Sequence, residues 1–324
     1  MFIEADARYG DPYAIADEDL DVTDAVLLED GDGNLEAHTT APGPPDSVLY
    51  LVDGVRRTDF RAHDILDDGV VVRGLGGSYG VGAVACVPGQ RPVYVEPTIE
   101  RLLFWTHGHH GALGPCGGWE WQTVALATDD ADDLLSGLQR RMRDREASLA
   151  GELVARHGGE RVTVVRDGPL NRLYGLDAEV VGLVKSHHHP YLPAELHYRV
   201  PDVIAQPGQR TSLFRLRDDV WGCYLRLPTV GRVGPWAGIV RIDVPAAAGL
   251  AAAAGVADRV CGRLGPYAGI AHTDPRAPAN LQPIGALEYM LRHRLGDIGG
   301  ALRAARQAAV MTPAAPHTST GAAR

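Results

Sequence analysis

Two aspartates that end strand-like runs are the residues in this sequence best placed to do chemistry. Asp53 follows Val48–Val52, Asp167 follows Val162–Arg166, and each aspartate is followed by glycine. A carboxylate at the end of a buried strand is held rigidly, and two of them on neighbouring strands repel each other unless a cation lies between them. Mg²⁺ and Mn²⁺ prefer such oxygen ligands. The pattern predicts a divalent-metal site, with a pair of simple Asp-Gly turns as the alternative.

A third carboxylate, Glu146, stands out by its place in a predicted helix over residues 129–157. This segment opens with four aspartates, which favour a helix N-terminus, and its apolar residues recur mostly at three- and four-residue spacing. Glu146 lies four residues after Met142 and three before Leu149, on the apolar stripe. A carboxylate that faces a core needs a partner. Metal coordination beside the two aspartates would supply one, and a salt bridge to a buried arginine is the alternative.

Other polar motifs give weaker evidence for a functional site. Lys185 ends a strand-like run after the second Asp-Gly, where a cation could hold a phosphate or simply be a surface lysine. Histidines gather at 107–110 and 187–189, but consecutive loop histidines point in different directions, so a metal site there is the weaker reading. The run Gly74–Gly82 lacks the GxxxxGK[ST] pattern of a phosphate loop and predicts a tight hairpin.

Composition places the chain among ordinary globular proteins. It has 324 residues, 45% hydrophobic and 22% charged, with a net charge of −10. The sequence has no run of eighteen apolar residues, so no membrane-spanning helix is predicted. The acidic N-terminus is unlike a secretory signal. The four cysteines form no CxxC pair. We therefore expect a cytoplasmic protein that does not enter membranes. The acidic charge argues against coating nucleic acid through bulk charge but is compatible with a metal-dependent nucleic-acid enzyme.

The remaining patterns predict an α/β fold with a mixed sheet. We expect an acidic N-terminal arm over 1–46, one main domain over 47–310 and a disordered tail over 311–324. Short strands without intervening helices suggest an antiparallel meander, with strands at 48–52, 70–73, 81–87, 92–95, 102–105 and 119–127. Beyond the helix we expect strands at 161–166, 179–185, 212–216, 222–227 and 238–244. Helices are expected at 246–264, 283–295 and 303–310.

Several short motifs, in this order, resemble the NurA nuclease family, and the C-terminal pair resembles its bacterial branch. They are Val52-Asp-Gly-Val-Arg-Arg57, Gly80-Val-Gly-Ala-Val84, Arg166-Asp-Gly-Pro-Leu170, Val180-Val-Gly-Leu-Val-Lys185, Asp274-Pro-Arg-Ala-Pro-Ala-Asn-Leu-Gln-Pro283 and Leu287-Glu-Tyr-Met-Leu-Arg-His293. The resemblance spans about residues 46 to 310. It implies a ribonuclease H-like core with additional strands and C-terminal helices. It also implies Mn²⁺-dependent DNA cleavage, with 5′-to-3′ exonuclease and some single-strand endonuclease activity.

The resemblance further implies partners and roles for individual residues. It implies a homodimer that docks on a HerA-type hexameric ATPase and processes DNA ends for repair. Matched by position, the metal-binding and catalytic residues are Asp53, Glu146 (with Glu152 as the fallback), Asp167, Lys185 and Tyr224. One or two metal ions, Mn²⁺ or Mg²⁺, would be held there, and in the two-ion mechanism one would activate a water and the other would stabilise the leaving oxygen. Arg56 and Arg57 would neutralise charge on the phosphate or act as salt-bridged scaffold.

One position departs from the better-studied archaeal members, which have a histidine in the C-terminal helical region. Glu288 occupies the matching place here, and His272 and His293 are nearby candidates. If Glu288 is the counterpart, it would be another metal ligand. Two other functions remain open at this point: a catalytically inactive adaptor of a DNA-translocating ATPase, and a metal-dependent nuclease that acts on RNA.

Overall fold

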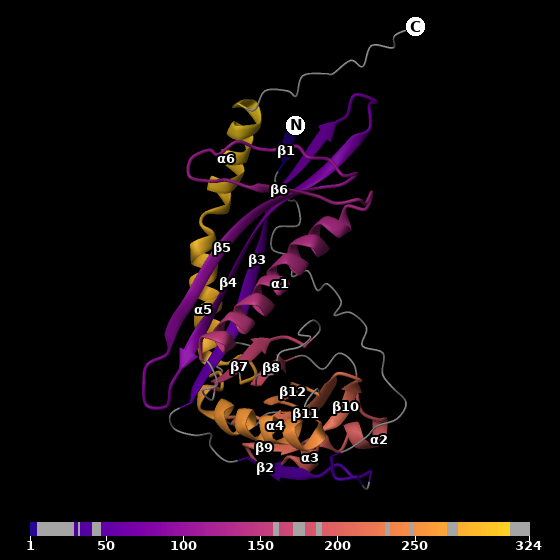
Figure 1. Cartoon of the computed structure of the whole chain (residues 1–324), viewed down its shortest axis with the longest axis vertical. Coiled ribbons are helices and arrows are strands. Elements are labelled where there is room, and N and C mark those ends of the chain that lie inside the picture. The colour runs from indigo at the N-terminus through magenta and orange to yellow at the C-terminus, as the bar shows by residue number, and fades with distance from the viewer. Residues whose placement is uncertain are drawn as a thin grey trace.

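One mixed β-sheet runs through the whole molecule (Figure 1). The computed structural model describes residues 1–4, 29–31, 33–40, 47–157, 162–170, 179–185, 190–230, 234–246, 249–270 and 278–311. Within them the sheet has twelve strands, ten of which follow the order β2-β9-β11-β12-β8-β7-β3-β4-β5-β6, while β1 pairs with β3 and β10 with β11. The α/β class predicted from the sequence is confirmed.

Three long antiparallel strands form the upper part of the molecule. They are β3 (Val48–Ile65), β4 (Val71–Cys86) and β5 (Val93–Trp105), and the short β6 (Gln122–Ala125) pairs in parallel with β5. The antiparallel meander is confirmed, but its division into shorter strands is wrong. Asp53 consequently lies inside β3 rather than at its end.

The glycine-rich run is also strand and not a hairpin, because it is the middle of β4. Its glycines make room for large side chains that cross the sheet surface. A Cβ on Gly74 would lie 2.7 Å from the Trp105 ring, and one on Gly76 would overlap the ring of Phe60. Steric exclusion by neighbouring rings, and not turn geometry, therefore accounts for these glycines.

A helix and two parallel strands complete the centre of the sheet. Helix α1 (Asp132–Arg156) connects β6 to β7 (Val162–Asp167), which runs parallel to β3, and β8 (Glu179–Val184) runs parallel to β7. The predicted long helix is thus confirmed. Antiparallel strands extend the sheet beyond β8: β9 (Gln209–Thr211), β10 (Phe214–Arg217), β11 (Val220–Arg226) and β12 (Ile239–Pro245).

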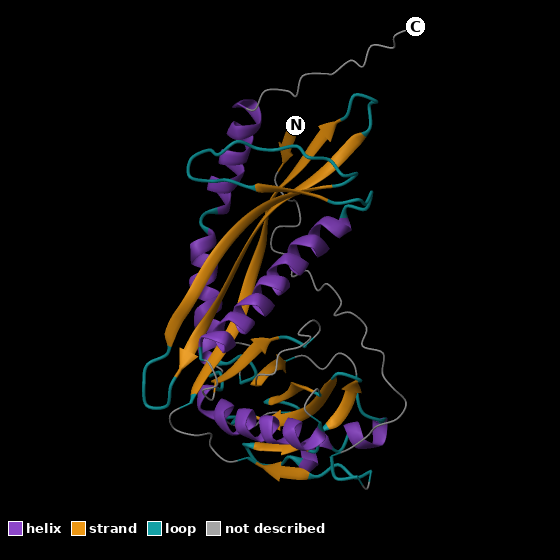
Figure 2. Cartoon of the chain, in the orientation of Figure 1, coloured by secondary structure: helices purple, strands orange, loops and turns teal. Residues whose placement is uncertain are grey.

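Helices cover both faces of the sheet (Figure 2). Helix α1 lies across one face of the long strands, and α5 (Gln282–Leu295) and α6 (Ile298–Met311) follow one another along the other. The remaining helices lie with the lower strands: α4 (Leu250–Leu264), the short α2 (Ala194–His197) and α3 (Val200–Val203), and the 3-10 turn Gly265–Tyr267. Among the described residues, no helix combines the length and apolarity needed to cross a membrane.

The alternation of side chains along β3 decides which face each functional group reaches. Val52 packs with the core on the α1 side, whereas Leu51 and Val55 pack with α5 residues such as Leu287. Asp53 therefore points to the α5 side and Gly54 to the α1 side.

The chain termini only partly match the predicted arm and tail. The N-terminal segment contributes β1 (Phe2–Glu4), which pairs with β3, and β2 (Ala37–Thr39), which pairs with β9, so these parts belong to the sheet. Residue 311 ends α6, and 312–324 lie outside the described residues. The His187–His189 group and His272 also lie outside them.

Candidate metal centre

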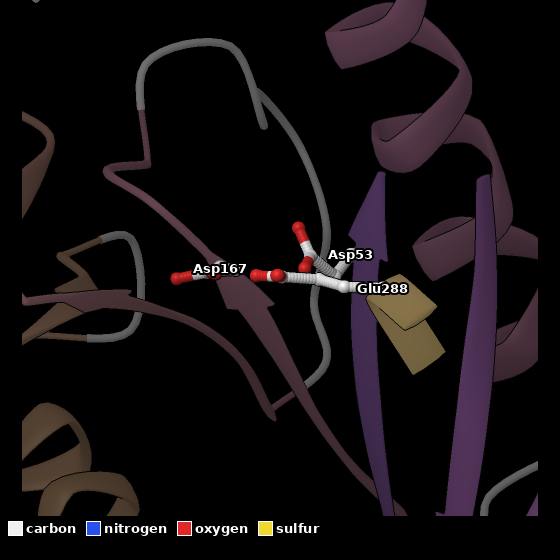
Figure 3. A group of neighbouring side chains, drawn as sticks. All are labelled: Asp53, Asp167 and Glu288. Atoms are coloured by element: carbon white, nitrogen blue, oxygen red, sulfur yellow. The ribbon is translucent and has the colours of Figure 1, made fainter. Parts of the chain in front are cut away.

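Three carboxylates from distant parts of the chain converge on the α5 side of the sheet (Figure 3). Asp53 of β3, Asp167 at the end of β7 and Glu288 of α5 each offer an oxygen, and these oxygens lie within 4.8 Å of one another. The strand register explains the meeting of the aspartates. Val52 pairs with Arg166 in the parallel ladder, so the next residue of each strand emerges on the opposite face, side by side.

The cluster leaves negative charge buried and only partly compensated. Asp53 is 6% exposed, and its Oδ1 accepts a hydrogen bond from the Gly54 amide at 2.7 Å. Its Oδ2 is buried without a hydrogen-bond partner. Burial, followed by repulsion from Asp167, raises the pKa of Asp53 well above its usual range. An oxygen-preferring divalent cation would supply the missing partner, so the donor set fits Mg²⁺ or Mn²⁺.

Two cations pair with the other two carboxylates of the cluster. The Lys185 ammonium forms an ion pair with Asp167 and donates a hydrogen bond to Asn280 Oδ1 at 2.5 Å. Arg292, which is largely exposed, lies 3.0 Å from Glu288 one helical turn away. Lys185 thus lies beside the cluster, and its catalytic role stays a prediction. Asn280 stands in the Asp274–Pro283 motif, but nothing in that pattern singled it out as a site residue.

Glu146 lies on the other face of β3, behind the cluster. It is 3% exposed and forms an ion pair with Arg166, with 3.7 Å between Oε2 and Nη2. A Cβ on Gly54 would lie 2.5 Å from Glu146 Oε1, so this glycine provides the space that the carboxylate occupies. Burial raises the pKa of Glu146 to about 7, with Arg166 opposing that rise. The structure thus places Glu146 in the salt bridge anticipated as the alternative, and its role as a metal ligand stays a prediction.

The other predicted site residues lie apart from the carboxylates. Glu152, the fallback, pairs with Arg145 at 2.6 Å near the helix surface. Tyr224 is buried in an aromatic cluster with Phe214, His197 and Trp236 on the α1 side, and burial raises its pKa. Its catalytic role stays a prediction.

Three further polar candidates also lie outside the carboxylate cluster. His293 is exposed on α5, so Glu288 is the residue of that helix that reaches the centre. Arg57 forms an ion pair with Asp59 and donates a hydrogen bond to the Gly296 carbonyl oxygen at 2.7 Å. These contacts give it a structural role. His109 pairs with Asp64, at the far end of β3.

The comparisons with known proteins add no identification. No protein-family model matches the chain, and no curated protein matches it. The fold and site define a mixed α/β protein with a buried three-carboxylate centre beside a lysine. Such a centre can hold a hard divalent cation, and a cation so held acts on water and phosphate oxygens.

Proposed function

We propose that this protein is a divalent-metal-dependent nuclease that hydrolyses phosphodiester bonds in DNA. The observation that carries the proposal is the convergence of Asp53, Asp167 and Glu288 around a buried Asp53 oxygen without a hydrogen-bond partner. Bound Mn²⁺ or Mg²⁺ would lower the pKa of a water and stabilise the leaving oxygen. The three carboxylates would hold the cation, and burial of two of them would exclude competing water.

The order of the central strands supports the further proposal of a ribonuclease H-like core. The strands β5, β4 and β3 are antiparallel neighbours, β7 and β8 continue beside β3 in parallel, and α1 makes the crossover before β7. The additional strands and C-terminal helices then extend this core, and one of those helices brings Glu288 to the centre.

Lys185 would act on the substrate rather than on the metal. Its ammonium lies beside Asp167, the most exposed of the three carboxylates. A phosphate oxygen that approaches the centre from this side would meet a positive charge that is already fixed by Asp167 and Asn280. Fixed charge of this kind stabilises the pentacovalent phosphate because it needs no reorganisation during the reaction.

The finer features of the proposal come from the sequence resemblance. They are 5′-to-3′ polarity with some single-strand endonuclease activity, preference for Mn²⁺, a homodimer, and action with a HerA-type hexameric ATPase in DNA end processing and repair. The alternative from a different class is an inactive adaptor of that ATPase. The partly uncompensated buried charge favours the metal-binding enzyme, because an adaptor has no need for it.

The test compares Mn²⁺-dependent degradation of end-labelled linear DNA by wild type, Asp53→Asn and Asp218→Asn, with and without the ATPase. Asp218 has the same charge but a 97% exposed side chain, so its variant is the matched control. We expect Asp53→Asn to lower the rate by about 100-fold or more and the control to match wild type. A wild type that binds Mn²⁺ but cleaves no DNA under either condition would favour the adaptor. Equal cleavage of matched RNA would redefine the substrate.

A further inference from the structure

Three arginines gather on the α1 side of the sheet, directly behind the metal centre. They come from three elements: Arg56 from β3, Arg143 from α1 and Arg166 from β7. Burial and then repulsion from Arg143 lower the pKa of Arg56. Burial also lowers the pKa of Arg166, where Glu146 opposes this fall and Arg143 adds to it. Arg143 lies on the same face of α1 as Gln139, which accepts a hydrogen bond from Arg56, and Glu146, which pairs with Arg166, so the three guanidinium groups face one region.

The hydrogen bonding of this arginine cluster is incomplete at its innermost member. Arg166 is 4% exposed, and its Nη2 faces Glu146 at 3.7 Å. Its Nε and Nη1 are buried without a hydrogen-bond partner. A buried guanidinium with two unused N–H groups is costly, because those groups have lost water and gained nothing in return. Such an arrangement is stable where an anion completes it.

The outer members give an anion access to the cluster. Arg56 and Arg143 are half-buried, and Arg56 donates through Nε to Gln139. The carboxylates that face the cluster are Glu146 and, more weakly, the exposed Asp144.

The cluster is tied to the metal centre by the backbone. Arg166 immediately precedes Asp167, and Glu146 packs against Gly54, which immediately follows Asp53. An anion that binds at the cluster thus lies on the opposite face of the sheet from the metal centre, one residue along the backbone from Asp167 and from Asp53.

We propose that Arg56, Arg143 and Arg166 bind a phosphate group of the DNA strand, and that this group neighbours the phosphate that is cleaved. This inference rests on the proposed function for the identity of the strand, whereas the anion site itself rests only on the arginines. Guanidinium groups suit this ligand, because each presents planar pairs of N–H donors that match phosphate oxygens. The unused donors of Arg166 would form the floor of the site and Arg143 its solvent side.

The test measures binding of a short fluorescent single-stranded oligonucleotide without metal, so that no cleavage occurs. Arg143→Ala is compared with Arg140→Ala, which removes the same charge from an exposed position on the same helix. We expect Arg143→Ala to weaken binding by about 10-fold, the effect of one charged hydrogen bond. It should also reduce the slope of log affinity against log salt by about 0.7, the value for one phosphate of a single strand. Arg140→Ala should change affinity less than about 2-fold.

A second measurement separates this inference from the proposed function. Inorganic phosphate should raise the thermal midpoint of wild type and of Arg140→Ala but not of Arg143→Ala, while Mn²⁺ binding stays unchanged in all three. That result supports the anion site even if the protein cleaves no DNA. If Arg143→Ala fails to fold, Arg143→Lys replaces it, because it keeps the charge but loses the paired donors. Equal binding of oligonucleotide and phosphate by wild type and the Arg143 variant overturns the inference.

Discussion

At the scale of single residues, Glu146 makes the stability of the metal-free protein depend on pH. Its folded pKa of about 7 lies above the ordinary 4.5. The folded chain therefore binds more protons than the unfolded chain in this interval. The stability from protonated Glu146 is fully present below pH 4.5 and is lost as the pH rises through 7.

We predict that Glu146→Gln flattens the pH dependence of unfolding. Between pH 5 and 8 without metal, the decline in the free energy of unfolding should be smaller in the variant by on the order of 1 to 3 kcal/mol. Urea unfolding at a series of pH values measures this. Glu152→Gln, on the same helix but much more exposed, should retain the wild-type curve. An unchanged slope in Glu146→Gln would show that this carboxylate does not gain its proton on folding.

At the scale of elements, the long strands depend on glycines that lie under aromatic rings. We predict that Gly76→Ala destabilises the protein by about 1 to 3 kcal/mol, because the new methyl group overlaps the buried ring of Phe60. Gly114→Ala is the control, since nothing lies within 4 Å of the added Cβ. It should change stability by less than about 0.5 kcal/mol. Chemical denaturation of both variants decides whether packing or turn geometry requires the glycine.

The sequence predicted elements better than it predicted their lengths or their meeting points. The apolar spacing in α1 and the short β-branched run of β7 each identified an element correctly. The glycines of β4 were read as a turn, since a single sequence does not show which ring packs over each glycine. Steric relief and chain reversal both select glycine, so composition alone does not separate them.

For the candidate site too, local pattern predicted single residues but not how they meet in space. Asp53 and Asp167 were predicted from local pattern, because each ends a strand-like run and is followed by glycine. Their convergence with Glu288 depends on strand register and on where α5 docks. Glu146 lies on the core side of its helix as predicted. Its partner Arg166 was not identified, because the alternation along β7 that turns Arg166 towards α1 requires the register to be known.

At the scale of the whole molecule, the carboxylate centre joins the C-terminal helices to the sheet. Two of its carboxylates belong to the central strands, and the third belongs to α5, more than a hundred residues later. Without a cation, the buried charges of Asp53 and Glu288 oppose this docking. A bound cation would convert the repulsion into attraction, and at 100 times its dissociation constant it would stabilise the folded state by about 2.7 kcal/mol.

We therefore predict that Mn²⁺ slows hydrogen exchange in α5 more than in α6. Helix α5 supplies Glu288, whereas α6 packs against the upper strands and supplies no described residue to the centre, so it serves as an internal reference. The amides of residues 282–295 that exchange by local opening should gain the most protection. In Glu288→Gln the difference between the helices should disappear, although the fold remains. Equal protection of both helices in wild type would mean that the cation acts on global stability alone and that α5 docks without it.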